Sequence, residues 1–201
     1  GGRIVDCRSG EIVYQRMLSP SIVPSLYGFA RDRGCGLITY LGDQVISAFE
    51  PDEYVLLEAR INGLPVRQVD RFVEFVDFDV NKCLLTAPPE VAYEYEMTLR
   101  ERCEGIADVY RSEEFFIEVM PQNVNKASSL ERMLESLGLG RENAICCGDG
   151  FNDVSMIRYA GLWVAMGNAK PEVKAAADYV TSSNDEDGLV EVIHRFILKE
   201  N

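Results

Sequence analysis

The stretch of sequence that decides the fold runs from residue 144 to residue 153 and reads Ala-Ile-Cys-Cys-Gly-Asp-Gly-Phe-Asn-Asp. Its first four residues are apolar without alternation, which is typical of a strand buried on both faces of a parallel sheet. Gly148 and Gly150 permit a sharp turn and a close approach of the backbone to a ligand. Asn152 and Asp153 then begin a helical pattern. The stretch therefore predicts a strand, a turn and a helix, with Asp149 directly beyond the strand.

Strands and helices continue to alternate on both sides of this stretch. Upstream, apolar residues recur at the spacing of an amphipathic helix, and these are Leu130, Met133, Leu134 and Leu137. Downstream, the sequence predicts strands at 162–166 and 179–181 and helices at 171–177 and 188–198. This alternation indicates a doubly wound parallel sheet, so the C-terminal part of the chain is expected to be an α/β domain.

The sequence before this domain has a different character. Hairpin signals such as Gly42-Asp43 alternate with short helical patterns such as the one that begins near Pro20. This mixture predicts an α+β module. We expect a core or linker segment at residues 1–15, the α+β module at residues 16–115 and the α/β core at residues 116–201.

Composition and charge argue against several classes of function. The 201 residues include 20 Lys and Arg against 33 Asp and Glu, which gives a net charge of -13. A surface this acidic repels phosphate backbones, so we expect no general binding to nucleic acid or to anionic membranes. No apolar run approaches the roughly 18 residues of a membrane span. The six cysteines show no metal-ligand spacing, which favours reduced thiols and a cytoplasmic location.

Oxygen donors gather in the turn that follows the strand at 144–147. Asp149, Asn152 and Asp153 supply two carboxylates and one amide within five positions. In open α/β sheets, ligands bind beyond the carboxyl ends of the strands. This donor set suits Mg2+, a hard cation that keeps several waters and takes only one or two carboxylates. The alternative is structural, with Asp149 capping a helix or a turn and the glycines serving only as turn residues.

Lys126 is the second candidate, because it stands directly before the amphipathic helix. An ammonium near a helix N-terminus opposes the helix dipole unless an anion is bound there. Taken alone, a solvated lysine is the simpler interpretation. His194, the only histidine, is expected on the surface, and Trp163 is expected in the core of its strand.

Together these motifs resemble the haloacid dehalogenase (HAD) superfamily of phosphotransferases. The resemblance rests on Val124-Asn125-Lys126 and on the segment Gly148–Met156, and it runs essentially unbroken over residues 111–196. Further segments look like the Cof-type, type IIB sugar-phosphatase branch, and these are Val164–Ala169, Ala177–Thr181 and Asn184–Gly188. The α+β stretch before them is similar to the cap domain of that branch. The resemblance therefore implies a HAD-like doubly wound core with an inserted α+β cap domain of type C2B.

The resemblance also implies a covalent mechanism. In this family an Asp attacks phosphorus, a second Asp two residues on acts as general acid and base, and the aspartyl-phosphate is then hydrolysed. Asp149 aligns with the carboxylate that holds Mg2+, and Asp153 with the acidic residue that orients the metal shell or the lysine. Lys126 aligns with the lysine that neutralises the nucleophile and the phosphoryl group. Asn152 aligns with an amide that contacts the phosphate end of the substrate.

The expected function is thus a Mg2+-dependent phosphatase of a small phosphorylated metabolite, such as a sugar phosphate. The family's attacking Asp-x-Asp followed by Gly-Thr has no counterpart here, so we expect an N-terminally truncated chain that is inactive alone. Asp77-Phe78-Asp79 follows an apolar run but lacks Gly-Thr, and an exposed loop is its simpler interpretation. The alternative function is a non-catalytic module that binds a metabolite or a cation. The sequence sets neither the substrate nor the oligomeric state.

Overall fold

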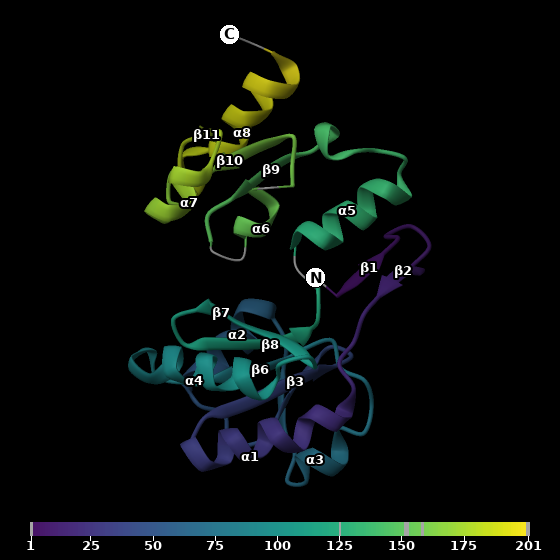
Figure 1. Cartoon of the computed structure of the whole chain (residues 1–201), viewed down its shortest axis with the longest axis vertical. Coiled ribbons are helices and arrows are strands. Elements are labelled where there is room, and N and C mark those ends of the chain that lie inside the picture. Colours follow the sequence, from purple (N-terminus) through teal and green to yellow (C-terminus); the bar gives the residue numbers. More distant parts are fainter. Residues whose placement is uncertain (1, 125, 151–152, 158, 200–201) are drawn as a thin grey trace. The chain divides into compact units, whose positions relative to one another are not determined.

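The chain folds into two compact units, and the boundary between them lies between residues 124 and 125 of the sequence. The computed structural model describes residues 2–124, 126–150, 153–157 and 159–199 (Figure 1). No helix within these residues is long and apolar enough to cross a bilayer. No sheet is shared between the units in the described residues, and each unit has a core of its own.

The first unit begins with a small hairpin. Strands β1 (Arg3–Val5) and β2 (Ile12–Gln15) pair antiparallel. Asp6 closes the turn, because its Oδ1 accepts hydrogen bonds from the backbone N–H groups of Ser9 at 2.9 Å and Arg8 at 2.7 Å. These two bonds lower the pKa of the Asp6 carboxyl.

A six-stranded sheet forms the body of the first unit, in the order β5-β4-β3-β6-β8-β7. All neighbouring strands are antiparallel except β4 and β5, which are parallel. The strands are β3 (Gly36–Leu41), β4 (Gln44–Ser47), β5 (Val66–Gln68), β6 (Cys83–Thr86), β7 (Ala107–Glu113) and β8 (Phe116–Pro121). This mixture of hairpins and helices confirms the predicted α+β module.

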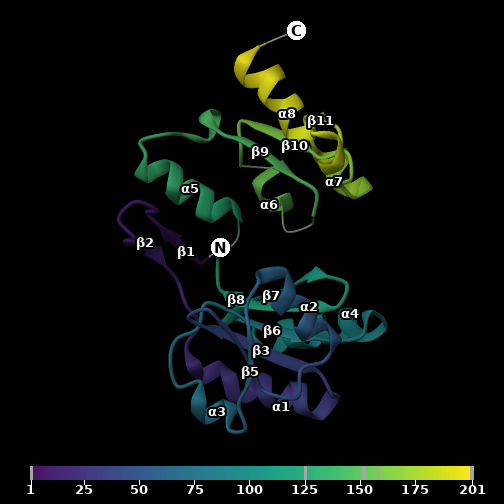
Figure 2. The same ribbon diagram turned by 180° about the vertical axis from the view of Figure 1, so that it is seen from behind.

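Helices cover both faces of this sheet. On one face, Phe29 of α1 and Leu99 of α4 pack with Leu85 and Ile117 of the strands. On the other face, Val55 of α2 packs with neighbouring strand residues. Figure 2 shows α2 on the opposite side of the sheet from α1. The helices are α1 (Val23–Arg33), extended at its start by a 3₁₀ turn at Pro20–Ile22, α2 (Glu53–Asn62), α3 (Phe72–Phe75) and α4 (Pro89–Arg102).

The division between the units differs from the expected boundary after residue 115. That boundary would separate β7 from β8, yet these strands form a hairpin in which Tyr110 pairs with Glu118. β8 also pairs with β6, so it lies inside the sheet of the first unit. The β1–β2 hairpin, expected to be a separate segment, is grouped with this unit as well. The first unit therefore ends at Val124.

A three-stranded parallel sheet organises the second unit, in the order β11-β10-β9. Its strands are β9 (Ile145–Gly148), β10 (Leu162–Ala165) and β11 (Tyr179–Val180). Its helices are α5 (Lys126–Ser136), α6 (Val154–Ile157), α7 (Pro171–Ala176) and α8 (Gly188–Val192), which continues as a π-helix through Ile193–Leu198. Short 3₁₀ turns lie at Arg141–Asn143 and Asn184–Glu186. Strand and helix alternate along the chain, which confirms the predicted α/β domain.

The core of this second unit centres on Trp163, which is completely buried as expected. Trp163 packs with Cys146 on β9 and with Val173 on α7. The amphipathic face predicted for α5 is buried only in part. Leu134 is buried, but Leu137, which follows the last residue of α5, is 64% exposed.

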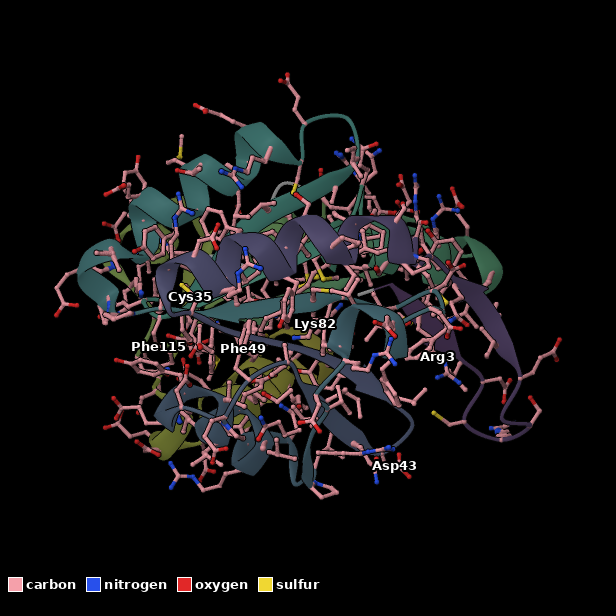
Figure 3. All side chains as sticks on the ribbon, turned by 90° about the horizontal axis from the view of Figure 1, so that it is seen from below. Arg3, Cys35, Asp43, Phe49, Lys82 and Phe115 are labelled. Atoms are coloured by element: carbon pink, nitrogen blue, oxygen red, sulfur yellow. The ribbon has the colours of Figure 1, made fainter. Side chains whose placement is uncertain are left out.

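A buried ion cluster lies on the α2 side of the six-stranded sheet. Lys82 is labelled in Figure 3. Its ammonium lies 3.0 Å from the Glu118 carboxylate and 3.7 Å from that of Glu58. The hydroxyl of Tyr40 donates a hydrogen bond to Glu58, and that of Ser112 donates one to Glu118 at 3.2 Å. Both glutamates are only 8% exposed. Burial, followed by the hydrogen bond to Glu58, raises the pKa of Tyr40.

We expect the Lys82→Met substitution to destabilise the first unit by about 3 kcal/mol, because it leaves two buried carboxylates without their cation. Urea unfolding followed by far-UV circular dichroism measures this loss. Adding Glu118→Gln should recover part of it. Arg71→Met, which breaks the exposed pair of Arg71 with Glu74, is the matched control and should cost less than about 1 kcal/mol. An equal loss in both variants would contradict this interpretation.

Glu191 of α8 ties the helix to the end of β11. Its carboxylate accepts hydrogen bonds from the Tyr179 hydroxyl, and from Oγ and the backbone N–H of Ser182 at 2.9 Å and 3.1 Å. These donors lower the pKa of Glu191 to about 2, from an ordinary value of 4.5, and the Tyr179 hydroxyl has the largest effect. The charged carboxylate therefore stabilises the fold above about pH 4.5, and this contribution is lost as the pH falls towards 2.

The Glu191→Gln variant should accordingly be less stable than the unaltered chain near neutral pH, and the difference should shrink to nothing near pH 2. Urea unfolding followed by the fluorescence of Trp163, the only tryptophan, reports on this unit alone. Glu172→Gln, at an exposed position on α7, is the control and should change little at any pH. If the stability difference between Glu191→Gln and the unaltered chain grew on acidification, the predicted pH dependence would be wrong.

Candidate phosphoryl and metal site

The candidate site lies where the three parallel strands of the second unit end. Because β9, β10 and β11 run in the same direction, the loops that follow them emerge at one edge of the sheet (Figure 1). Asp149 follows β9, Asn168 follows β10 and Asn184 follows β11. Residues distant in sequence are thereby brought together without any special local conformation.

Asp153 is the centre of the hydrogen-bonding network at this edge. Its Oδ2 accepts hydrogen bonds from the backbone N–H groups of Asp149 and Gly150, each at 3.1 Å. Its Oδ1 is ion-paired with the Lys126 ammonium at the first turn of α5. The side chain of Asp153 is only 7% exposed, whereas that of Lys126 is 43% exposed. Asp153 therefore fixes the loop after β9 and holds the exposed Lys126 ammonium beside that loop.

Gly148 makes this arrangement possible. A Cβ atom placed on Gly148 would lie 2.6 Å from Cβ and 2.7 Å from Cγ of Asp153, closer than real atoms approach. The absence of a side chain therefore lets the Asp153 carboxylate fold back against the end of β9. Gly148 therefore serves this close contact as well as the sharp turn that the sequence predicts.

Asp149 presents an exposed carboxylate beyond β9. Its Oδ2 accepts a hydrogen bond from Nδ2 of Asn168 at 2.9 Å, and its backbone carbonyl accepts one from the N–H of Lys170 at 3.4 Å. In the described part of the chain, no group of three or more His, Cys, Asp or Glu side chains could enclose a metal ion. An exposed carboxylate with open space for water fits Mg2+, which takes few protein ligands, better than it fits Zn2+.

The structure thus brings together three of the four predicted site residues, namely Lys126, Asp149 and Asp153. Asn152 lies outside the described residues. Asp77 is exposed in a loop of the first unit, and the apolar run before it contributes to α3 instead of a strand. Sequence reasoning missed Asn168, although it follows an apolar strand just as Asp149 does. The rule that places ligands at strand ends could have found it.

The Gly148→Ala substitution should destabilise the second unit by about 1–3 kcal/mol, because Asp153 must move away from β9. Urea unfolding followed by Trp163 fluorescence measures this change. Gly28→Ala on α1 of the first unit, where the new Cβ would meet no neighbouring element within 4 Å, is the control, and its unfolding is followed by far-UV circular dichroism. This control should be neutral or slightly stabilising. Equal stability of the Gly148→Ala variant and the unaltered chain would mean that the close contact is not needed.

Comparison with known proteins supports the resemblance deduced from the motifs. Residues 1–193 match the family described as haloacid dehalogenase-like hydrolase. The phosphoglycolate phosphatase of Methanothermobacter thermautotrophicus is 31% identical over 191 residues, which cover 94% of this chain and 81% of that protein. The 5-amino-6-(5-phospho-D-ribitylamino)uracil phosphatase of Bacillus subtilis is 48% identical over 82 residues, which span only 33% of its length and 41% of this chain.

Solved structures with the same fold include a haloacid dehalogenase-like hydrolase from Bacteroides thetaiotaomicron. It superposes with a TM-score of 0.89 at 41% identity, over 98% of this chain and 74% of that one. A sugar phosphatase of HAD subclass IIB superposes with a TM-score of 0.75 at 26% identity, over 92% of this chain and 70% of that one. The similarity therefore extends over both units.

Proposed function

Because the chain belongs to the haloacid dehalogenase-like hydrolases, we propose that it is a Mg2+-dependent phosphatase of a small phosphorylated metabolite, a sugar phosphate in particular. The observation that carries the proposal is the ion pair between Lys126 and Asp153, held next to the exposed carboxylate of Asp149. The names of the relatives support the substrate class, since each named substrate is a small phosphate ester.

The position of Lys126 favours a phosphoryl site over a plain cation site. A lysine ammonium repels a divalent cation bound close by, so a site built for the cation alone would be weakened by it. A phosphoryl group carries negative oxygens that contact a cation and an ammonium at the same time. Lys126 and a cation held by Asp149 therefore suit a ligand that is bound between two positive charges.

Each residue has a separate task in this proposal. Lys126 binds and neutralises the phosphoryl oxygens, and Asp153 holds its ammonium in place. Both oxygens of Asp153 already accept hydrogen bonds, so Asp149 is the carboxylate that remains exposed to hold Mg2+. When bound, Mg2+ neutralises charge on the phosphoryl oxygens during transfer. Asn152 is assigned to the phosphate end of the substrate by the resemblance alone.

The chemical step of the proposal is attack by an aspartate on phosphorus, which forms an aspartyl-phosphate. No Asp-x-Asp of this sequence is followed by the Gly-Thr that completes the family's motif for that step. We therefore propose that the 201-residue chain binds the cation and the phosphoryl group and has negligible turnover by itself. The second candidate function, a non-catalytic module that binds a metabolite or a cation, draws on this same observation.

Binding experiments test the site independently of turnover. Mn2+, detected by electron paramagnetic resonance, substitutes for Mg2+, and inorganic phosphate stands for the phosphoryl group. Asp149→Asn should weaken Mn2+ binding at least about tenfold, because it removes the charged ligand. Lys126→Met should leave Mn2+ binding unchanged or tighter and should weaken phosphate binding about tenfold. Hydrolysis of a panel of sugar phosphates is measured in parallel.

Two matched variants control for the change of charge. Glu142→Gln, at an exposed position in the turn before β9, and Lys174→Met on α7 should each leave both affinities unchanged. Loss of Mn2+ binding in Lys126→Met would contradict the assignment of a phosphoryl site. Robust hydrolysis that survives Asp77→Asn would contradict the inactivity of the chain alone. Phosphate binding that is unchanged in both Asp149→Asn and Lys126→Met would overturn the whole proposal.

A further inference from the structure

The side chain of Asn168 connects the loops after all three parallel strands. Its Nδ2 donates a hydrogen bond at 2.9 Å to Oδ2 of Asp149, which lies in the loop after β9. Its Oδ1 accepts from the backbone N–H of Asn184, in the loop after β11, at 3.1 Å. Asn168 itself belongs to the loop after β10. One amide group therefore contacts the candidate metal ligand at one end and a fixed backbone donor at the other.

The chemistry of these two neighbours fixes the orientation of the amide. A backbone N–H can only donate, so it requires the carbonyl oxygen of the Asn168 side chain. An ionised carboxylate can only accept, so it requires the NH2 group. Rotation of the amide by 180° would lose both hydrogen bonds at once. The donor that faces Asp149 is therefore set by the contact with Asn184 and not by Asp149 alone.

The loop that carries Asn168 is itself held on both sides. The N–H of Met166 donates to the carbonyl of Gly148 at 3.0 Å, and the N–H of Gly167 donates to the carbonyl of Ser182 at 2.9 Å. A Cβ on Gly167 would lie 2.6 Å from the backbone nitrogen of Ser183, so the two loops are closely packed. Asn168 therefore projects from a backbone that cannot easily shift.

Asp149 needs such support more than Asp153 does. Asp153 is buried and accepts hydrogen bonds with both of its oxygens. Asp149 is exposed, and an exposed carboxylate otherwise samples several rotamers, which must be restricted when a cation binds. Hydrogen bonds to the ligands of a metal orient them and raise metal affinity.

We propose that Asn168 is a positioning residue for Asp149, which holds one carboxylate oxygen so that the group is preorganised for a hard divalent cation. This inference rests on the proposed function, since it takes Asp149 to be the metal ligand. It assigns Asn168 no contact with the substrate. The contact between Asn168 and Asn184 makes the loop after β11 part of the same support.

The test compares Mn2+ affinity with the urea midpoint and with the affinity for inorganic phosphate. A purely structural role of Asn168 would lower the urea midpoint together with Mn2+ affinity. The variant is Asn168→Ala in the full 201-residue chain. Its Mn2+ dissociation constant should rise about ten- to hundredfold, the range typical of lost hydrogen bonds to metal ligands. Its urea midpoint, followed by Trp163 fluorescence, should not change, and neither should its affinity for inorganic phosphate without metal, which depends on Lys126.

A second variant reaches the same amide from its other neighbour. Asn184→Pro removes the backbone N–H that Oδ1 of Asn168 accepts from, at the first position of a 3₁₀ turn, where proline is tolerated. The amide then loses one of its two restraints, and Mn2+ affinity should fall, but by less than in Asn168→Ala. Asn143→Ala removes an exposed asparagine that accepts from the N–H of Gly140, and it serves as the control with unchanged Mn2+ affinity.

Each outcome separates this inference from the proposed function. If Asn168→Ala binds Mn2+ within twofold of the unaltered chain while Asp149→Asn does not, the inference is overturned and the proposed function stands. A fall of the urea midpoint in step with the loss of Mn2+ affinity would assign Asn168 to the fold and also overturn it. If the unaltered chain shows no saturable Mn2+ binding, the proposed function fails and the inference fails with it.

Discussion

The buried carboxylate of Asp153 holds the candidate site together. It accepts hydrogen bonds from two successive backbone N–H groups and is ion-paired with the ammonium of Lys126. A charge that is only 7% exposed must be compensated in this way, because an unpaired buried carboxylate costs several kcal/mol. The need to satisfy Asp153 therefore fixes the loop after β9 and brings α5, which carries Lys126, to the same place. Gly148 meets the steric demand of this contact.

The parallel sheet supplies the remaining order at this edge. Strands that run in one direction place the loops after them side by side, so Asp149 and Asn168 meet across 19 positions of sequence. Backbone hydrogen bonds between the loops, such as that from Gly167 to Ser182, keep them in register. The result is a set of short connections whose polar side chains contact one another. A site built in this way depends on the sheet more than on the conformation of any single loop.

The first unit is organised differently, by antiparallel hairpins, and it contains a polar cluster of its own. Antiparallel hairpins with local turn signals form its sheet, and helices cover both faces. Because hairpins are encoded locally, their positions could be predicted closely from the sequence. The boundary of the unit was harder to predict, since β8 is buried along all six residues. Apart from Glu118, β8 is apolar, and a strand covered on both faces has a similar apolar pattern in an antiparallel sheet and in a parallel core.

The sequence by itself determined the alternation of strands and helices and the glycine-rich turn after β9, and it singled out Lys126, Asp149 and Asp153 as candidate site residues. These features are local, because residue spacing, turn chemistry and motif order are written along the chain. Only the tertiary structure decided that Asp153 is buried and paired with Lys126, that Gly148 leaves room for it, and that Asn168 contacts Asp149. Except for the contact between Gly148 and Asp153, these contacts join residues that are separated by 19 or more positions in the sequence. They exist because the sheet and its buried charge require them, and no pattern of spacing along the sequence records that requirement.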